Sequence, residues 1–285
     1  MNRIASFALA LGLVAAGFAP AAAQSTWLDR EHRPSVLVET LFPNFDSGSD
    51  GIFDSADTGF PTWTWFAAAR LPTGETTMFV AELPYSRGEL QQGSVSESEA
   101  TIGNPYLGIE YAPRPSGFLL EFGARIPLAS DEMLLPILVG FYTDVEREEA
   151  FVHDRVPVRL GLHYHRAASA NAHIAYDVRL VPSVWISTDD MFDSSAETEA
   201  FLGYGAWVRY EGESVRVGGG LTGRWITSND GADFSEASVH QFDLGADFLR
   251  GAVRPGVQLK LPLDDDLTSV LNSVVGVSIT ILPGL

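Results

Sequence analysis

Histidine is the first residue type to test for chemistry in this chain, because its side chain serves in acid–base catalysis and binds metals. The six histidines are His32, His153, His163, His165, His173 and His240. They form no HExxH or comparable ligand pattern, and the sequence contains no GxSxG motif. His163 and His165 would share one face of a strand, where hydrogen bonding is a commoner role than metal binding. The sequence therefore predicts no enzyme activity, no metal site and no cofactor.

Acidic residues form a second candidate set, because they occur in short runs. These runs are DSGSDGIFDSAD (46–57), SESE (96–99), DVEREE (144–149), STDDMFD (187–193) and DDD (264–266). Neither the first nor the last has the spaced ligands of an EF-hand loop. We interpret all five as parts of solvated loops, with divalent-ion bridging to lipopolysaccharide as a minor alternative. The net charge of −19 argues against a nucleic-acid partner.

Basic residues follow a different pattern, because many of them alternate with apolar residues. In RVPVRLGLHY (155–164), Val, Leu and Tyr occupy every second position, and Arg, Pro, Gly and His lie between them. A strand directs successive side chains to opposite faces, so this stretch predicts a strand with one apolar and one polar face. What each face contacts depends on how often the pattern recurs.

The alternation recurs along most of the chain. We predict about twelve strands, near residues 35–42, 61–71, 75–84, 102–112, 117–127, 154–166, 171–187, 198–210, 214–227, 237–249, 252–262 and 271–282. Most are longer than the roughly 5 or 6 residues of an ordinary strand. Their connections alternate between short (72–74, 113–116, 167–170, 211–213, 250–251) and long (43–60, 85–101, 128–153, 188–197, 228–236, 263–270). Both features are typical of outer-membrane barrels, whose periplasmic turns are short and whose external loops are long.

We therefore predict an all-β fold, a closed antiparallel transmembrane β-barrel of about twelve strands. A soluble β-sandwich is the alternative, but it gives no reason for every long loop to lie at one end. Residues 130–151 lack clean alternation, and Pro136 would fall in the first turns of a helix, where proline is tolerated. We predict a short helix there, in the third external loop, folded on or into the barrel mouth. A strand pair in this segment would instead give fourteen strands.

The N-terminus predicts export. Residues 1–23 have a basic Arg3, an apolar run and a small-residue site of three alanines, which together predict a signal peptide cleaved before Gln24. Residues 24–285 would then form one barrel in the bacterial outer membrane. The expected partners are membrane lipid, lipopolysaccharide, the barrel-assembly machinery and a small-molecule solute of unknown identity.

In such a barrel the apolar face contacts lipid and the polar face lines the lumen. The same parity directs ten basic side chains inward: Arg70, Arg125, Arg155, Arg159, Arg179, Arg209, Arg216, Arg224, Arg254 and Lys260. It directs six acidic side chains inward: Glu82, Glu110, Glu121, Asp177, Asp243 and Asp247. One interpretation is a structural ladder of Arg–carboxylate pairs, because buried charges need partners. The other is a lumen with surplus positive charge that favours anionic or carboxylate-bearing solutes.

Two blocks carry a resemblance to a known family. The segments IGNPYLGIEYAPRPSGFLLEFGARIPLA (102–129) and VRPGVQLKLPL (253–263) resemble strands of the MetA-pathway phenol-degradation and fatty-acid-transporter-like channel proteins of bacterial outer membranes. The resemblance implies a barrel that takes up small, often aromatic or amphipathic, compounds. The resemblance assigns no functional residue to this chain, because it depends on the general sequence pattern of the strands and not on a binding or catalytic motif.

Two functions follow as hypotheses. The first is an outer-membrane channel or transporter-like barrel for small solutes, anionic or aromatic. The second is a non-conducting structural or adhesion-type barrel that acts through its external loops. Single-channel conductance separates the two.

Overall fold

A computed structural model describes residues 33–46, 62–92, 95–113, 117–130, 132–168, 173–188, 198–229, 231 and 233–283. The predicted signal peptide and its cleavage site before Gln24 lie outside these ranges, as do most of the acidic runs at 46–57 and 187–193. Among the described residues, no helix is both long and apolar enough to cross a membrane.

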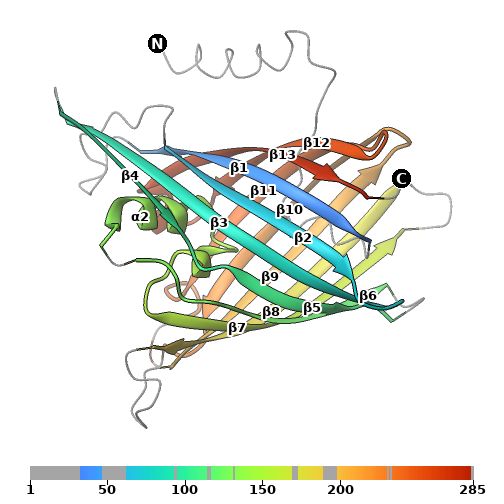
Figure 1. The fold of residues 1–285 in the computed structure, drawn as a ribbon, viewed down its shortest axis with the longest axis horizontal. Helices are drawn as coiled ribbons and strands as arrows, with labels where there is room; N and C mark the ends of the chain where they lie inside the picture. The colour runs from blue at the N-terminus through green and yellow to red at the C-terminus, as the bar shows by residue number, and fades with distance from the viewer. Residues whose placement is uncertain are drawn as a thin grey trace.

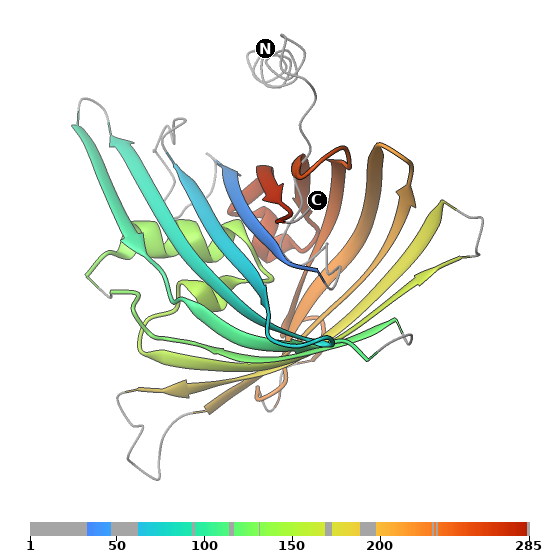
Figure 2. The same cartoon turned by 45° about the vertical axis from the view of Figure 1, so that its right-hand side comes forward.

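Strands make up most of the described chain. They are β1 (Ser35–Phe45), β2 (Trp63–Pro72), β3 (Thr77–Gln92), β4 (Val95–Ile102), β5 (Tyr106–Tyr111), β6 (Phe118–Arg125), β7 (Arg155–Ala167), β8 (Ile174–Ser187), β9 (Thr198–Glu211), β10 (Val215–Ile226), β11 (Ser238–Phe248), β12 (Val253–Pro262) and β13 (Leu271–Ile281). Strands adjacent in sequence pair antiparallel, except that β5 pairs with β3 and not with β4, and β1 pairs with β13. Within the described ranges these pairings close a twelve-stranded barrel, with β4 as one additional strand (Figures 1 and 2). The predicted fold is confirmed.

The additional strand corrects one expectation. Residues 85–101 were predicted as a long loop, but β3 continues to Gln92 and pairs there with β4, whereas its first half pairs with β5. β4 and β5 therefore share one side of β3, separated at residues 103–105. The strand pair is hidden in the sequence because SRGELQQGSVSESE offers no apolar face. Alternation marks only strands that have a core or lipid to face.

The outer surface of the barrel is apolar. Each barrel strand in the described ranges exposes at least one large hydrophobic side chain, for example Val36, Leu71, Leu83, Leu107, Phe122, Leu160, Val178, Val208, Leu221, Leu244, Val253 and Val277. A continuous apolar band on a soluble protein would be a strong aggregation hazard, whereas lipid solvates it. The parity predicted from RVPVRLGLHY agrees with this arrangement, since Leu160 and Leu162 are exposed and Arg159 and His163 are buried.

The connection between β6 and β7 folds into the barrel instead of forming two more strands. It contains α2 (Leu134–Thr143) and the 3-10 helix η1 (Glu148–Ala150), and a further short helix, α3 (Asp265–Thr268), precedes β13. Pro136 lies in the first turn of α2, where an amide donor has no helical partner to lose. The predicted helix in the third external loop is confirmed, and the fourteen-strand alternative is wrong. We call residues 132–154 the plug.

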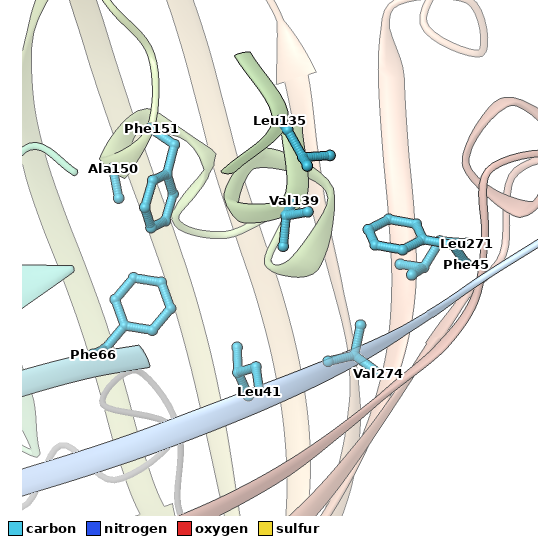
Figure 3. Close-up of a cluster of buried hydrophobic side chains, with 9 residues drawn as sticks. All are labelled: Leu41, Phe45, Phe66, Leu135, Val139, Ala150, Phe151, Leu271 and Val274. Atoms are coloured by element: carbon cyan, nitrogen blue, oxygen red, sulfur yellow. The ribbon is translucent and has the colours of Figure 1, made fainter. Parts of the chain in front are cut away.

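One side of the plug packs against the barrel wall through an apolar cluster. The cluster joins Leu135, Val139, Ala150 and Phe151 of the plug to Leu41, Phe45, Phe66, Leu271 and Val274 on β1, β2 and β13 (Figure 3). Gly140 permits close packing here, because a Cβ atom at that position would overlap the Phe151 ring. The apolar cluster therefore fixes the plug near the place where the first and last strands meet, and α2 also packs against β3 and β4.

Candidate functional site in the barrel interior

The barrel interior contains the residues selected from the sequence. Thirteen of them are buried: Arg70, Arg125, Arg159, Arg179, Arg209, Arg216, Arg224, Lys260, Glu82, Glu110, Glu121, Asp243 and Asp247. Arg155, Arg254 and Asp177 are half-buried. They share strand parity with the buried set, so all sixteen lie on the inner side of the barrel wall.

Some of these residues pair with other residues of the wall. Arg70 lies 3.0 Å from Glu110, and Arg216 lies 2.9 Å from Asp247. Arg209 lies 2.7 Å from Asp177, which also contacts His165. These three pairs lie near the strand ends that carry the short connections. The wall of this half of the barrel therefore carries matched charges.

In the other half, the wall cations face the plug. Arg125 contacts Glu149 at 3.3 Å, and Arg159 contacts the same carboxylate at 2.9 Å. Lys260 lies 2.8 Å from Asp144. Further ion pairs join Arg179 to Glu146 and Arg224 to Glu148. The plug thus presents its carboxylates to a ring of wall cations on β6, β7, β8, β10 and β12.

Arg147 is the central cation of the plug. Its guanidinium pairs with Glu39 on β1 and with Asp144, and it lies 3.5 Å from Glu82 on β3. It also lies 3.6 Å from the centre of the Phe66 ring. Arg147 and Asp144 have no exposed surface. One buried guanidinium therefore connects the plug to two strands of the wall.

Burial and charge act in opposite directions on the acid of this network. Burial raises the pKa of Asp144, but the positive charges of Arg147 and Lys260 outweigh burial and hold that pKa below its ordinary value of 3.8. Burial lowers the pKa of Arg147. The carboxylates of Asp144, Glu39 and Glu82 together raise that pKa by more than burial lowers it, and leave it above its ordinary value. Both groups are therefore charged when the plug is in place.

This arrangement corrects the predicted charge balance. The run DVEREE was interpreted as part of a solvated loop, but its charged side chains are buried against the wall. The plug and β1 add five interior carboxylates, Glu39, Asp144, Glu146, Glu148 and Glu149, whereas Arg147 adds one cation. Among the described interior residues named here, the added carboxylates offset the excess of wall cations. The prediction of a surplus counted the wall alone.

Glu39 is a charged wall residue that the predicted set does not include. It lies on β1, where Leu37 and Leu41 share its inward face and are buried with it. Leu41 packs against the plug, and the apolar inner residues leave β1 without a clear polar face. The available signal was a single carboxylate within the apolar run SVLVETLF. Such a residue is buried only with a partner, which here is Arg147.

Aromatic rings support the cations that face the plug. Arg224 lies 3.8 Å from the Phe201 ring centre and 4.3 Å from that of Trp185. Arg179 lies 5.2 Å from the ring centre of Trp207. These cation–π contacts hold each guanidinium against the wall. Gly220 makes room for Trp207, because a Cβ atom there would overlap the indole.

A narrow cavity separates the plug from the wall of β7, β8, β9 and β10. Its volume is about 30 Å³, and its charged lining comprises Glu146, Glu149, Arg159, Arg179 and Arg224. A volume of this size holds water but excludes a larger solute. No cluster of three or more His, Asp or Glu side chains suited to a metal ion occurs within the described ranges.

Comparisons with known proteins identify the fold. No protein-family model matches the chain, and no curated protein matches it. The COG4313 outer-membrane channel from Pseudomonas putida F1 is similar at a TM-score of 0.56 and 14% identity, over 91% of this chain and 98% of that one. The NanC porin is similar at a TM-score of 0.50 and 7% identity, over 86% and 98% of the two chains. The fold is that of an outer-membrane β-barrel. The resemblance to outer-membrane channel proteins is confirmed at this level.

Proposed function

We propose that this outer-membrane barrel is a channel for small polar solutes. In this proposal, solutes pass between the plug and the wall of β7–β10. The observation that supports it is the difference between the two sides of the plug. One side meets β1, β2 and β13 through a tightly packed apolar cluster and the fully buried Arg147–Glu39 pair, and the other meets cations across a cavity lined by charged groups.

The physical argument concerns what each contact excludes. The apolar contact leaves no polar group to replace the hydration shell of a solute, so it acts as a seal. The ionic contact offers guanidinium and carboxylate groups that can replace lost water. Passage along the ionic side requires rearrangement of the plug carboxylates, because the present gap admits only water.

The solute preference follows from the charges left behind. With the plug in place, its described carboxylates offset the excess of wall cations. When the plug carboxylates move away, the wall presents Arg159, Arg179 and Arg224 to the passage. A confined positive surface attracts anions and repels cations. We therefore propose that the conducting state prefers small anions. Export by the predicted signal peptide, and insertion by the barrel-assembly machinery among lipopolysaccharide, belong to the same proposal.

Planar-bilayer recording tests this function. The wild type should show discrete conductance steps, and reversal potentials under a KCl gradient should indicate anion preference. The double variant Arg159→Glu with Arg179→Glu should shift that preference toward cations. Arg216→Glu is the matched control, because it changes an interior arginine that does not line the cavity. An electrically tight membrane with every variant would instead support the non-conducting barrel.

A further inference from the structure

We propose that Arg179 and Arg224 form a binding site for small dicarboxylates, and that Glu146 and Glu148 of the plug occupy the two carboxylate positions in the closed state. The inference depends on the proposed channel, because it names the solute class that the same passage would admit. It goes beyond a general preference for anions, since it predicts discrimination by the number of carboxylates.

The two arginines are alike in environment and in partner. Arg179 is 4% exposed and Arg224 is 8% exposed, and both line the same cavity. Each pairs with a different carboxylate of the plug, Glu146 or Glu148. A guanidinium recognises any carboxylate of suitable geometry through charge-assisted hydrogen bonds. The plug therefore supplies in cis the same functional group that a dicarboxylate would supply.

The arginines belong to the rigid part of the molecule. They extend from β8 and β10, which both pair with β9, and the rings of Trp207, Trp185 and Phe201 support them. Their carboxylate partners belong to the plug, in the turn and 3-10 helix that follow α2. Exchange at this site would thus replace the plug carboxylates and leave the two cations in position. Such preorganised cations favour binding because they need no reordering.

Exchange of two side chains need not release the whole plug. Arg147 would still bind Glu39, Lys260 would still bind Asp144, and the apolar cluster around Val139 would be unchanged. A solute cannot simply add to the closed site, because the cavity of about 30 Å³ is too small.

The number of carboxylates decides the cost of exchange. A dicarboxylate that displaces Glu146 and Glu148 gives both guanidiniums a new partner. A monocarboxylate leaves one guanidinium buried without that partner, and a neutral solute leaves both in this state. Removing one partner of a buried ion pair without replacing it costs far more free energy than exchanging that partner for another of the same charge. The site should therefore rank succinate above butyrate, and butyrate above neutral solutes.

Isothermal titration calorimetry of the full barrel in detergent micelles tests the site with succinate and butyrate as probes. In Glu146→Gln with Glu148→Gln, the competing carboxylates are absent, so succinate should bind at least tenfold more tightly than to the wild type. Butyrate should gain less. Asp247→Asn is the control, because it removes an interior carboxylate that lies outside the cavity lining. Its succinate affinity should equal that of the wild type. Unchanged or weaker succinate binding by the double variant would overturn the proposal.

A second variant keeps the test valid if loss of buried charges impairs folding. Adding Arg179→Gln and Arg224→Gln to the double variant leaves no unpaired member of either ion pair, and heat-modifiable gel migration verifies the barrel. This quadruple variant should not bind succinate, and retained binding would refute the site. KCl conductance separates this failure from failure of the channel. If the barrel conducts but the four substitutions leave its succinate affinity unchanged, the proposed channel function stands and the binding site is refuted. If the barrel never conducts, the channel function is refuted.

Discussion

Replacing Arg147 by methionine should release the plug without damaging the barrel. Methionine has similar length and packs well against Phe66, so the change removes charge rather than volume. The loss deprives Glu39, Asp144 and Glu82 of one cation. Breaking a buried ion pair from one side costs about 3–5 kcal/mol.

The lower end of that range applies, because each carboxylate keeps another contact. Glu39 accepts a hydrogen bond from Gln258 at 2.5 Å, Glu82 pairs with Arg125 at 2.8 Å, and Asp144 pairs with Lys260 at 2.8 Å. A loss of about 3 kcal/mol would shift the equilibrium between docked and released plug by about 100-fold.

The assay is the open probability of single channels in planar bilayers. Arg147→Met should raise the ratio of open to closed time by about that factor and leave heat-modifiable gel migration unchanged. Arg216→Met is the matched control, since Arg216 is a buried arginine paired with Asp247 of the neighbouring strand. Equal open probabilities in the wild type and Arg147→Met, with the barrel intact, would refute the view that this guanidinium fastens the plug. An equal rise in both variants would show that any lost interior cation has the same effect.

Three further predictions concern lipid contact, acid and packing. Leu160→Arg, in the middle of the lipid-facing row of β7, should lower the unfolding free energy in bilayers by about 2–4 kcal/mol, whereas Leu160→Met should cost less than about 1.5 kcal/mol; equal costs in urea titrations would contradict the assigned parity. Because its pKa is depressed, Asp144 should contribute its full stabilisation above its ordinary value of 3.8 and lose it as pH falls through the lower pKa of the docked state. Open probability should therefore be steady from neutral pH to about pH 5 and rise below pH 3.8, and a rise near pH 6 would contradict this assignment. Gly220→Val should displace Trp207 and cost about 1–3 kcal/mol, measured by urea unfolding and tryptophan fluorescence, and an unchanged spectrum would count against the close contact.

The barrel wall was predictable because its physical cause is local. In a strand such as RVPVRLGLHY, apolar residues alternate with polar ones because one face contacts lipid and the other faces the charged interior. The alternation therefore gives the strand and the parity of Arg159 together. Burial of Arg159 and exposure of Leu160 follow from that single periodicity. The short connections were equally local, since they only join adjacent strands.

The plug contacts were not predictable, because no local pattern encodes them. The run DVEREE resembles any acidic loop. Its partners are spread along the chain, from Glu39 on β1 to Lys260 on β12. Only closure of the barrel brings those partners around one segment. The hairpin of β3 and β4 was missed for a related reason, since neither of its faces is marked by apolar residues.

The position of the apolar cluster has a consequence for assembly. α2 packs against β1, β2, β3 and β4, and the apolar cluster that it joins also includes side chains of β13. Leu41 and Val274 of that cluster are neighbours only when the β1–β13 seam has formed. Contacts of such sequence separation form late, because their loop-closure entropy must first be overcome. A chain inserted in the membrane should therefore complete its wall before the plug can dock. Assembly intermediates should be leaky, and loss of that leak would mark docking of the plug, which follows completion of the seam.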